Sequence, residues 1–361
     1  MPISQKIENY LANSSWIRKM FEEGEKLRTI YGADKVYDFT IGNPYMEPTA
    51  KCQETLLRLV QNPEPGMHGY MSNAGYPSTR QAVADALQKE TGLPFTIDHI
   101  MMSVGAGGAL NSALKTFLDP GDQVIVFKPF FVEYRFYADN HNGQTVELAT
   151  DANFKPIPEL LAEAITPKTR LVLINTPNNP TGVVYSAEDL EMINRICLEK
   201  GQEFGTTIYV LSDEPYKKIA YDGIKVPSVF KHIKNVIVAT SHSKDLALPG
   251  ERIGYLAVSP NCQDAQKIMN GLIFCNRTLG YVNAPALMQR LVAELQEESI
   301  SLQMYQDNRD LLYNHLISLG FEVNKPQGAF YFFPKSPLED EVEFINIAKK
   351  YGRSKCEILT A

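Results

Sequence analysis

The middle of the chain alternates short β-rich runs with longer segments of helical periodicity, and this alternation constrains the fold most. A helical segment such as 187–205 lies between several of these runs. Since parallel strands need crossovers of a dozen or more residues, the pattern predicts right-handed βαβ units and a mostly parallel sheet with helices on both faces. The β-rich runs are 122–128 (DQVIVFK), 170–175 (RLVLIN), 207–213 (TIYVLSD), 235–240 (NVIVAT) and 253–258 (IGYLAV).

The sequence after about residue 283 has a different texture. Residues 284–318 carry one long helical pattern. Residues 321–334 (FEVNKPQGAFYFFP) predict a hairpin or strand pair, and residues 341–352 are helical again. This mixture is typical of a second, smaller α+β domain.

Length and texture together predict the domain limits. At about 100–200 residues per domain, 361 residues allow two or three domains. We expect residues 1–45 to form an N-terminal arm and part of the small domain. The large domain is expected over 46–283, and an incomplete small domain over 284–361.

Composition excludes several functional classes. The net charge of −7 argues against nucleic-acid binding, which normally requires a basic surface. The five cysteines include no CxxC pair and no histidines form HExxH or HxH, so neither a disulfide framework nor a metal site is expected. The N-terminus is unlike a signal peptide, and no apolar run reaches membrane-spanning length. We therefore expect a cytoplasmic protein with reduced thiols and no membrane contact.

Polar residues of several kinds follow the ends of three predicted strands. Because ligands of open α/β sheets bind at the carboxyl ends of the strands, these residues are candidates for one site. Asn179, Asp213 and Lys244 are separated by 34 and 31 residues, about one βα unit each, so all three can line one crevice. The candidates are Asn179, Asp213, Tyr216, Ser241, Ser243, Lys244 and Arg252.

Small residues open the helical run that ends near Phe117. Residues 103–110 read SVGAGGAL, and such a helix start leaves backbone N–H groups available to an anion. The stretch is no dinucleotide fingerprint, because Leu110 stands where the third glycine of GxGxxG is needed. It is no P-loop either, since no Gly-Lys-Ser/Thr follows. A phosphate is therefore plausible without a nucleotide.

Each candidate alone has an ordinary structural explanation, and only the combination is specific. Lys244 could be a surface lysine, Asp213 a helix N-cap, and Arg252 a salt-bridge residue. A lysine beside a phosphate site, an aspartate and two polar groups directed at one ring are what pyridoxal phosphate (PLP) requires. The lysine forms the Schiff base, and the aspartate keeps the pyridine nitrogen protonated.

With these motifs in place, the chain resembles fold-type I PLP-dependent enzymes, the class I/II aminotransferases of the aspartate and alanine type, from about residue 15 to residue 351. The resemblance implies an α/β fold with a mostly parallel seven-stranded sheet in the large domain. Its strongest motifs are Asn175-x-Pro177-x-Asn179-Pro180-Thr181-Gly182, Asp213-x-x-Tyr216, Ser241-x-Ser243-Lys244, Gly250-x-Arg252-x-Gly254-Tyr255, and Pro129-Phe130-Phe131-x-x-Tyr134.

The resemblance also implies a role for each matching residue. Lys244 would form the aldimine and then act as the base, with Asp213 as partner of the pyridine nitrogen. Asn179 and Tyr216 would bind the ring hydroxyl, and Phe131 would stack on the ring. The phosphate would be bound by Ala106, Gly107, Ser241, Ser243 and Arg252, and by Tyr70 from the neighbouring subunit of a homodimer. Gly42, Asn43, Asn179 and Arg277 would contact the substrate, Arg277 through a side-chain carboxylate.

The implied activity is transfer of an amino group from an L-amino acid, aspartate or alanine, to a 2-oxo acid. Two alternatives remain open: a PLP-dependent C–S β-lyase, and a PLP-binding protein with impaired catalysis. The second arises because family members continue beyond the position of Tyr351 to an arginine that binds the substrate α-carboxylate. Arg353 does not match that motif. We therefore expect a truncated chain with a complete cofactor site and a weakened substrate site.

Overall fold

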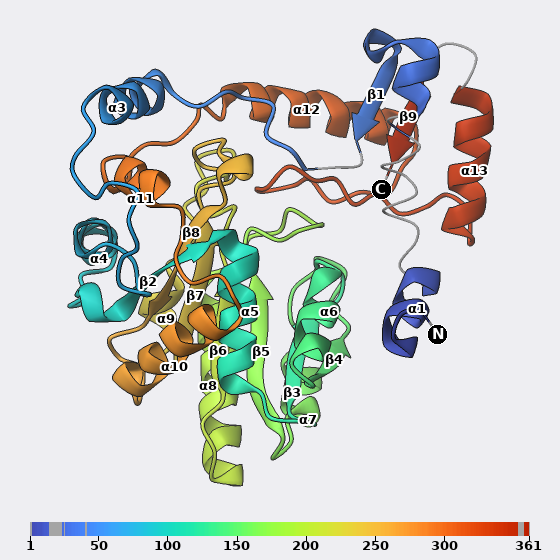
Figure 1. Ribbon diagram of the computed structural model, residues 1–361. Coiled ribbons are helices and arrows are strands. Elements are labelled where there is room, and N and C mark those ends of the chain that lie inside the picture. Colours follow the sequence, from blue (N-terminus) through green and yellow to red (C-terminus); the bar gives the residue numbers. More distant parts are fainter. Residues whose placement is uncertain (1, 14–23, 25, 40–41, 353–356, 361) are drawn as a thin grey trace. The chain divides into compact units, whose positions relative to one another are not determined.

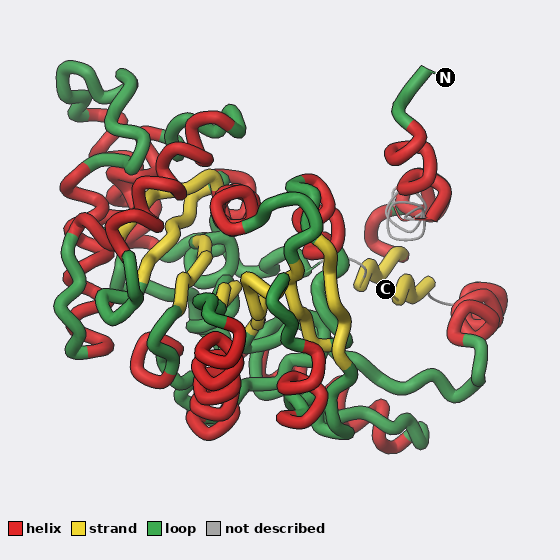
Figure 2. The backbone as a smooth tube through the Cα atoms, turned by 90° about the horizontal axis from the view of Figure 1, so that it is seen from below, coloured by secondary structure: helices red, strands yellow, loops and turns green. Residues whose placement is uncertain are grey.

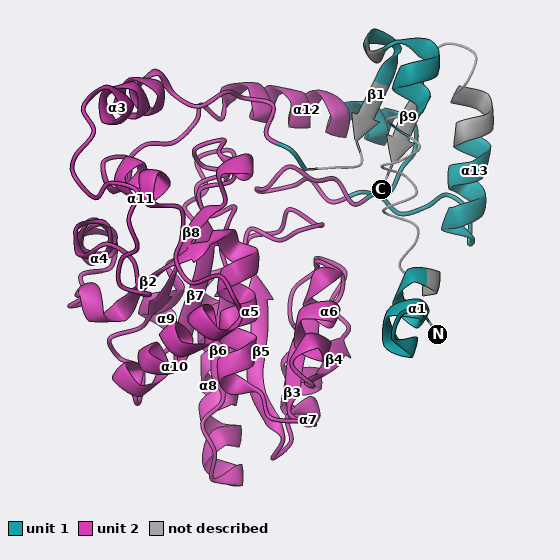
Figure 3. Ribbon diagram, in the orientation of Figure 1, with its two compact units in different colours: residues 1–43, 314–323, 334–361 teal, residues 44–313, 324–333 magenta. Residues whose placement is uncertain are grey.

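The structure is a computed structural model in which the chain divides into two compact units (Figures 1 and 3). It describes residues 2–13, 24, 26–39, 42–352 and 357–360. The larger unit comprises residues 44–313 and 324–333, and the smaller unit comprises residues 1–43, 314–323 and 334–361. The domain limits expected from the sequence stay a prediction.

Seven strands form one sheet in the larger unit, in the order β2-β8-β7-β6-β5-β3-β4 (Figure 1). Strands β3 to β7 run parallel, whereas β8 is antiparallel to both β7 and β2. The link from β7 to β8 is too short for a parallel crossover, which explains the reversal. The bounds are β2 Ile100–Val104, β3 Gln123–Phe127, β4 Gln144–Leu148, β5 Thr169–Asn175, β6 Tyr209–Asp213, β7 Val236–Ser241 and β8 Ile253–Val258.

All five strands predicted from the sequence are present, and the mostly parallel α/β sheet is confirmed. Strands β2 and β4 were not predicted. Helices lie on both sides of the sheet (Figure 2). Those of the larger unit are α3 Ala50–Gln61, α4 Pro77–Thr91, α5 Gly105–Phe117, α6 Glu133–Asn140, α7 Pro158–Ala164, α8 Ala187–Phe204, α9 Val229–His232, α10 Ala265–Thr278, α11 Ala286–Ala293 and the first part of α12 Gln303–Ser318.

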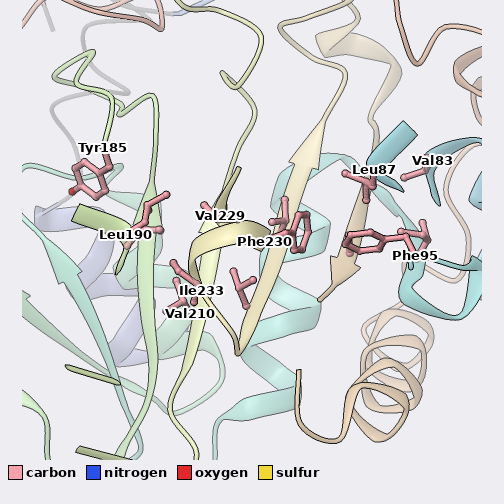
Figure 4. Close-up of a cluster of buried hydrophobic side chains, with 14 of the residues drawn as sticks. Val83, Leu87, Phe95, Tyr185, Leu190, Val210, Val229, Phe230 and Ile233 are labelled. Carbon is pink, nitrogen blue, oxygen red and sulfur yellow. The ribbon is translucent and has the colours of Figure 1, made fainter. Parts of the chain in front are cut away.

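Alternate residues of each central strand face opposite layers of the core. In β5, Leu171 and Leu173 pack in the cluster that contains α5 and α10, whereas Val172 and Ile174 pack with α4 and α8. Figure 4 shows part of the cluster that contains α4 and α8. In it the rings of Phe95 and Phe230 pack edge to face, with their centres 4.9 Å apart. Both faces of the sheet are therefore buried, as the apolar strands predict.

Helix α8 shows why the predicted segment 187–205 is helical. Its N-cap Ser186 and Asp189, the third residue of the helix, form a capping box, in which each side chain accepts a hydrogen bond from the other residue's backbone. Its C-cap is Gly205 at φ 63°, a left-handed conformation that glycine adopts readily. The helix therefore begins and ends where its sequence directs.

Two predictions for the C-terminal part are wrong. The single helix expected over 284–318 is two helices, α11 and α12, because the intervening Ile300 is buried and its N–H donates to Asp245 O at 2.8 Å. The hairpin expected over 321–334 is absent from this described stretch. Within this stretch, only Gly328 takes part in a β-bridge, which is antiparallel and pairs it with Ala220.

The smaller unit contains a two-stranded parallel sheet of β1 Val36–Phe39 and β9 Glu357–Thr360. Helices α1 Gln5–Asn13 and α13 Glu341–Gly352 also belong to it, and α13 confirms the helix predicted there. Within the described part of the chain, no helix is long and apolar enough to cross a membrane.

Candidate active site

The candidate residues follow the carboxyl ends of β5, β6 and β7. Asn175, the last residue of β5, pairs with Asp213, the last residue of β6, and Asp213 pairs with Ala239 of β7. These three parallel strands therefore end at one edge of the sheet, and the loops that follow them carry Asn179, Tyr216 and Lys244.

Asp213 is a buried carboxylate with one oxygen left unpaired. Its Oδ2 accepts a hydrogen bond from the Tyr134 hydroxyl at 2.7 Å, whereas its buried Oδ1 has no hydrogen-bond partner among the residues described. Burial raises the pKa of Asp213 to about 7; the Tyr134 bond lowers it and the nearby Glu214 carboxylate raises it. An unpaired carboxylate oxygen in such a place fits a cationic N–H donor.

Asn175 joins the loop after β5 to the end of β6. Its side-chain amide donates to Asp213 O at 2.8 Å, and its Oδ1 accepts from the backbone N–H of Asn179 at 2.6 Å. Since both bonds belong to one side chain, Asn175 fixes the position of Asn179 relative to Asp213.

Two tyrosine hydroxyls meet beside this loop. The Tyr216 and Tyr331 hydroxyl oxygens lie 2.6 Å apart, and either can be the donor. The Asn179 side chain also hydrogen-bonds Tyr216. Burial, followed by the Tyr331 hydroxyl, holds the pKa of the Tyr216 phenol well above its ordinary value, so Tyr216 is a neutral donor and acceptor at physiological pH.

Lys244 is a half-buried amine beside two aromatic rings. Its Nζ lies 5.9 Å from the centre of the Tyr216 ring and 6.0 Å from that of Phe330. Burial, with a smaller contribution from the Arg252 charge, lowers the pKa of Lys244 to about 8. A larger fraction of this amine is therefore uncharged and nucleophilic near neutral pH than for an exposed lysine.

The turn that carries Lys244 is cross-linked by buried side chains. His242 Nδ1 lies 3.2 Å from Asp245 Oδ2, and Lys244 lies between these two residues in the sequence. Lys218 Nζ lies 3.5 Å from the same carboxylate oxygen. Although burial acts to raise the pKa of Asp245, His242 and Lys218 hold it below its ordinary value. These contacts restrict the backbone on which Lys244 stands.

The start of α5 approaches Arg252 closely. Gly105, at φ +65°, begins the helix, and a Cβ placed on it would lie 2.9 Å from Arg252 Nη2. Ala106 and Gly107 follow in the first turn, where helix N–H groups are available to an anion. Arg252 is exposed at φ 51°, and its Nη1 donates to Pro249 O at 3.0 Å. The arrangement fits a phosphate.

Two buried serines complete this side of the site. Ser241 Oγ donates to Ser243 Oγ at 3.0 Å. Ser241 pairs with Gly254 on β8, and a Cβ on Gly254 would lie only 2.3 Å from Thr240 O. Only glycine fits there, so β8 packs tightly against the strand that carries the serines.

Phe131 is half-buried, and its ring meets the Tyr134 ring edge to face at 5.5 Å. Because Tyr134 donates to Asp213, this contact puts Phe131 in the same neighbourhood as the buried carboxylate. The larger unit therefore brings together all the residues expected to bind the cofactor from one subunit.

Two other expected residues, Tyr70 and Arg277, are exposed. Tyr70 is 95% exposed. Arg277 is exposed, and its Cζ lies 5.5 Å from the Phe274 ring. Gly42 and Asn43 belong to the smaller unit. Arg353 lies outside the described residues.

Sequence reasoning assigned no role to Asn175, Tyr134 or Tyr331, each of which contacts a candidate residue. The first two stand in the motifs that carry the resemblance, so a signal existed. Tyr331 gave none, because it is 115 residues from Tyr216 in the sequence.

Known proteins match the chain over most of its length. A family model for aminotransferases of class I and II matches residues 34–351. A probable aspartate aminotransferase of Methanocaldococcus jannaschii is 32% identical, over 87% of this chain and 82% of the relative. The crystal structure of an amino transferase from Eubacterium rectale matches with a TM-score of 0.92 and 37% identity, over 97% of this chain and 89% of that one. The structure of aspartate aminotransferase from Thermus thermophilus with maleate matches with a TM-score of 0.83 and 28% identity. The match covers 93% of this chain and 86% of that one.

Proposed function

The chain belongs to the class I and II aminotransferases, a PLP-dependent family, and from that premise we propose that it transfers the amino group of L-aspartate to 2-oxoglutarate. The sequence and structural matches favour an aminotransferase over a C–S β-lyase or an inactive PLP-binding protein. Aspartate is supported by the name of the Methanocaldococcus jannaschii relative. The Thermus thermophilus enzyme was solved with maleate, a four-carbon dicarboxylate like aspartate.

The unpaired Oδ1 of Asp213 carries the cofactor assignment. A neutral ring nitrogen could not satisfy an ionised, buried oxygen, whereas a protonated pyridine nitrogen can donate to it. When bound, PLP supplies an electron-withdrawing ring that stabilises negative charge at the substrate Cα. Asn179 and Tyr216 would bind the ring hydroxyl and Phe131 would cover the ring. The phosphate ligands would be Ala106, Gly107, Ser241, Ser243 and Arg252.

Lys244 would bind PLP covalently before substrate arrives and would then move the proton. Its Nζ lies 5.9 Å from the centre of the Tyr216 ring, beside the residues that would hold the cofactor. Because burial and Arg252 lower its pKa to about 8, the Lys244 amine would be able to accept a proton from the substrate Cα at neutral pH and deliver it to the cofactor carbon on the other side of the amino nitrogen.

The test is a spectrum followed by an assay. The purified chain reconstituted with PLP should show a visible band that L-aspartate bleaches and 2-oxoglutarate restores, with oxaloacetate and glutamate as products. D-Aspartate is the matched control, since it has the same charge. A band that no amino acid bleaches would refute the activity, and a Lys244→Ala chain that still forms the band would refute the assignment of Lys244.

The proposed substrate contacts come from Arg277, Gly42 and Asn43. Arg277 would bind the side-chain carboxylate of the substrate from the neighbouring subunit, and Gly42 and Asn43 would line the same space. An exposed guanidinium is compatible with this role. Arg277→Ala should raise KM for aspartate about tenfold or more and leave KM for alanine nearly unchanged. An unaltered ratio of the two would contradict the role.

We also propose a homodimer in which Tyr70 reaches the partner's phosphate site. A tyrosine that is 95% exposed in one chain is available for such a contact. Mixing Lys244→Ala chains with Tyr70→Ala chains should restore activity, because each hybrid dimer regains one intact site. No recovery from a mixture shown to exchange subunits would refute a shared site. A cytoplasmic location stays a prediction.

A further inference from the structure

The segment 326–331 is hydrogen-bonded to the two loops that carry Asn179 and Tyr216. The backbone N–H groups of Gln327 and Gly328 both donate to Gly182 O at 2.9 Å, in the loop after β5. Ala329 N donates to Ile219 O at 3.0 Å, in the loop after β6. One short stretch of chain thus joins both loops.

Close backbone packing fixes the segment at this place. A Cβ on Gly328 would lie 2.5 Å from Ile219 O, and a Cβ on Gly182 would lie 2.6 Å from Pro326 Cβ. Tyr221 adds a hydrogen bond from its hydroxyl to Ala329 O at 2.5 Å. Because backbone hydrogen bonds and the buried Tyr221 hydroxyl together hold the segment, the position of Tyr331 relative to Tyr216 is defined.

The hydroxyl groups of Tyr216 and Tyr331 carry one hydrogen each. Each phenol donates one hydrogen bond, so only one of Tyr216 and Tyr331 can donate across their 2.6 Å contact. The Asn179 side chain also bonds Tyr216. The Tyr216 hydrogen can therefore point either toward Tyr331 or away from it, and Lys244 Nζ lies 5.9 Å from the centre of the Tyr216 ring.

We propose that the Tyr216–Tyr331 hydrogen bond reverses its direction when PLP is bound: Tyr331, as a positioning residue, then donates this hydrogen bond to Tyr216 and thereby directs the Tyr216 hydrogen toward the ring oxygen of PLP. The inference rests on the proposed function, since it concerns the same site. A negatively charged ring oxygen attracts the Tyr216 proton, and the freed Tyr216 lone pair then accepts from Tyr331. A phenol that accepts one hydrogen bond becomes a stronger donor in another, so Tyr331 acts on the cofactor through Tyr216.

Removal of the Tyr331 hydroxyl should weaken the stabilisation of the anionic ring oxygen. The pH midpoint at which the visible band of bound PLP changes should therefore rise. Tyr331 and Tyr216 form two successive hydrogen bonds that end at the ring oxygen. Loss of the first, which is neutral, corresponds to a rise in the pH midpoint of about half a unit to one unit. Tyr216→Phe should raise the midpoint by more, because it removes the direct contact.

The test is a spectrophotometric pH titration of four reconstituted proteins: the unchanged chain, Tyr331→Phe, Tyr216→Phe and the double variant. If Tyr331 acts through Tyr216, the double variant has the same midpoint as Tyr216→Phe. An unchanged midpoint in Tyr331→Phe would overturn the proposal. So would a further rise in the double variant, which would mean that Tyr331 contacts the cofactor by itself.

Tyr221→Phe is the matched control, since it removes a tyrosine hydroxyl that holds the same segment by donating to Ala329 O. It should lower thermal stability and leave the midpoint unchanged. An equal midpoint rise in Tyr221→Phe would show a merely structural effect and overturn the proposal. If the unchanged chain forms no visible band with PLP, the proposed function itself has failed, which is a different outcome.

Discussion

Asp213 makes the stability of the cofactor-free chain depend on pH in an unusual direction. An aspartate in an ion pair stabilises a protein as the pH rises, whereas Asp213 has no cationic partner among the described residues and its pKa is raised to about 7, mainly by burial. The folded state therefore favours the neutral carboxyl. This contribution is fully present below the ordinary pKa of 3.8 and is lost as the pH rises through about 7.

The size of the effect follows from that rise in pKa. Each pKa unit corresponds to about 1.4 kcal/mol, so ionising Asp213 costs the folded chain about 4 kcal/mol once the pH is above 7. Between pH 5 and pH 8 the loss is about 2–3 kcal/mol. Asp213→Asn removes the ionisation, and its amide oxygen can still accept the Tyr134 hydrogen bond. The variant should therefore gain stability over the unchanged chain as the pH rises.

Urea unfolding of the cofactor-free proteins, followed by circular dichroism from pH 5 to pH 8, measures this difference. Asp307→Asn is a matched control, because it removes one carboxylate from the exposed surface of α12. Equal stability of Asp213→Asn and the unchanged chain across the whole range would refute the reasoning. Saturating PLP should remove the penalty, because a protonated ring nitrogen would pair the ionised oxygen.

Three further predictions concern neighbouring residues. Tyr134→Phe removes the hydrogen bond that lowers the pKa of Asp213, so the pH at which the cofactor-free chain loses stability should move upward; a downward move would contradict this. Acylation of Lys244 in the cofactor-free chain, followed by mass spectrometry, should have its midpoint near pH 8, and a midpoint near 10 would mean that the amine is not desolvated. Gly254→Ala should destabilise the fold by about 2–3 kcal/mol, because its Cβ would meet Thr240 O, whereas Gly250→Ala has open space and should change little. Equal thermal stabilities of the two would contradict the packing.

The sequence predicted what depends on local pattern and on strand spacing. Five strands and α8 follow from periodicity and caps, and the gathering of Asn179, Asp213 and Lys244 at one sheet edge follows from their βα spacing. The break between α11 and α12 could not be predicted, because it depends on Ile300 reaching Asp245 in another part of the fold.

Contacts between side chains that are far apart in the sequence could not be predicted either. Tyr134 and Asp213 are 79 residues apart, and no periodicity states that their side chains meet. The same holds for the pairing of the segment around Gly328 with Gly182 and Ile219, which replaces the expected hairpin. Such contacts are set by how the packed elements approach one another, which a pattern of residues along the chain does not specify.

The attachment of residues 326–331 to the loops after β5 and β6 has a consequence for how the protein is made. Synthesis proceeds from the N-terminus, so the ribosome releases Lys244, Asp213 and the whole parallel sheet well before Tyr331. In a nascent chain, Lys244 can thus be outside the ribosome while the segment 326–331, which contains Phe330 and Tyr331, is still in the exit tunnel. PLP captured at that stage would meet Lys244 before residues 326–331 join the two loops after β5 and β6.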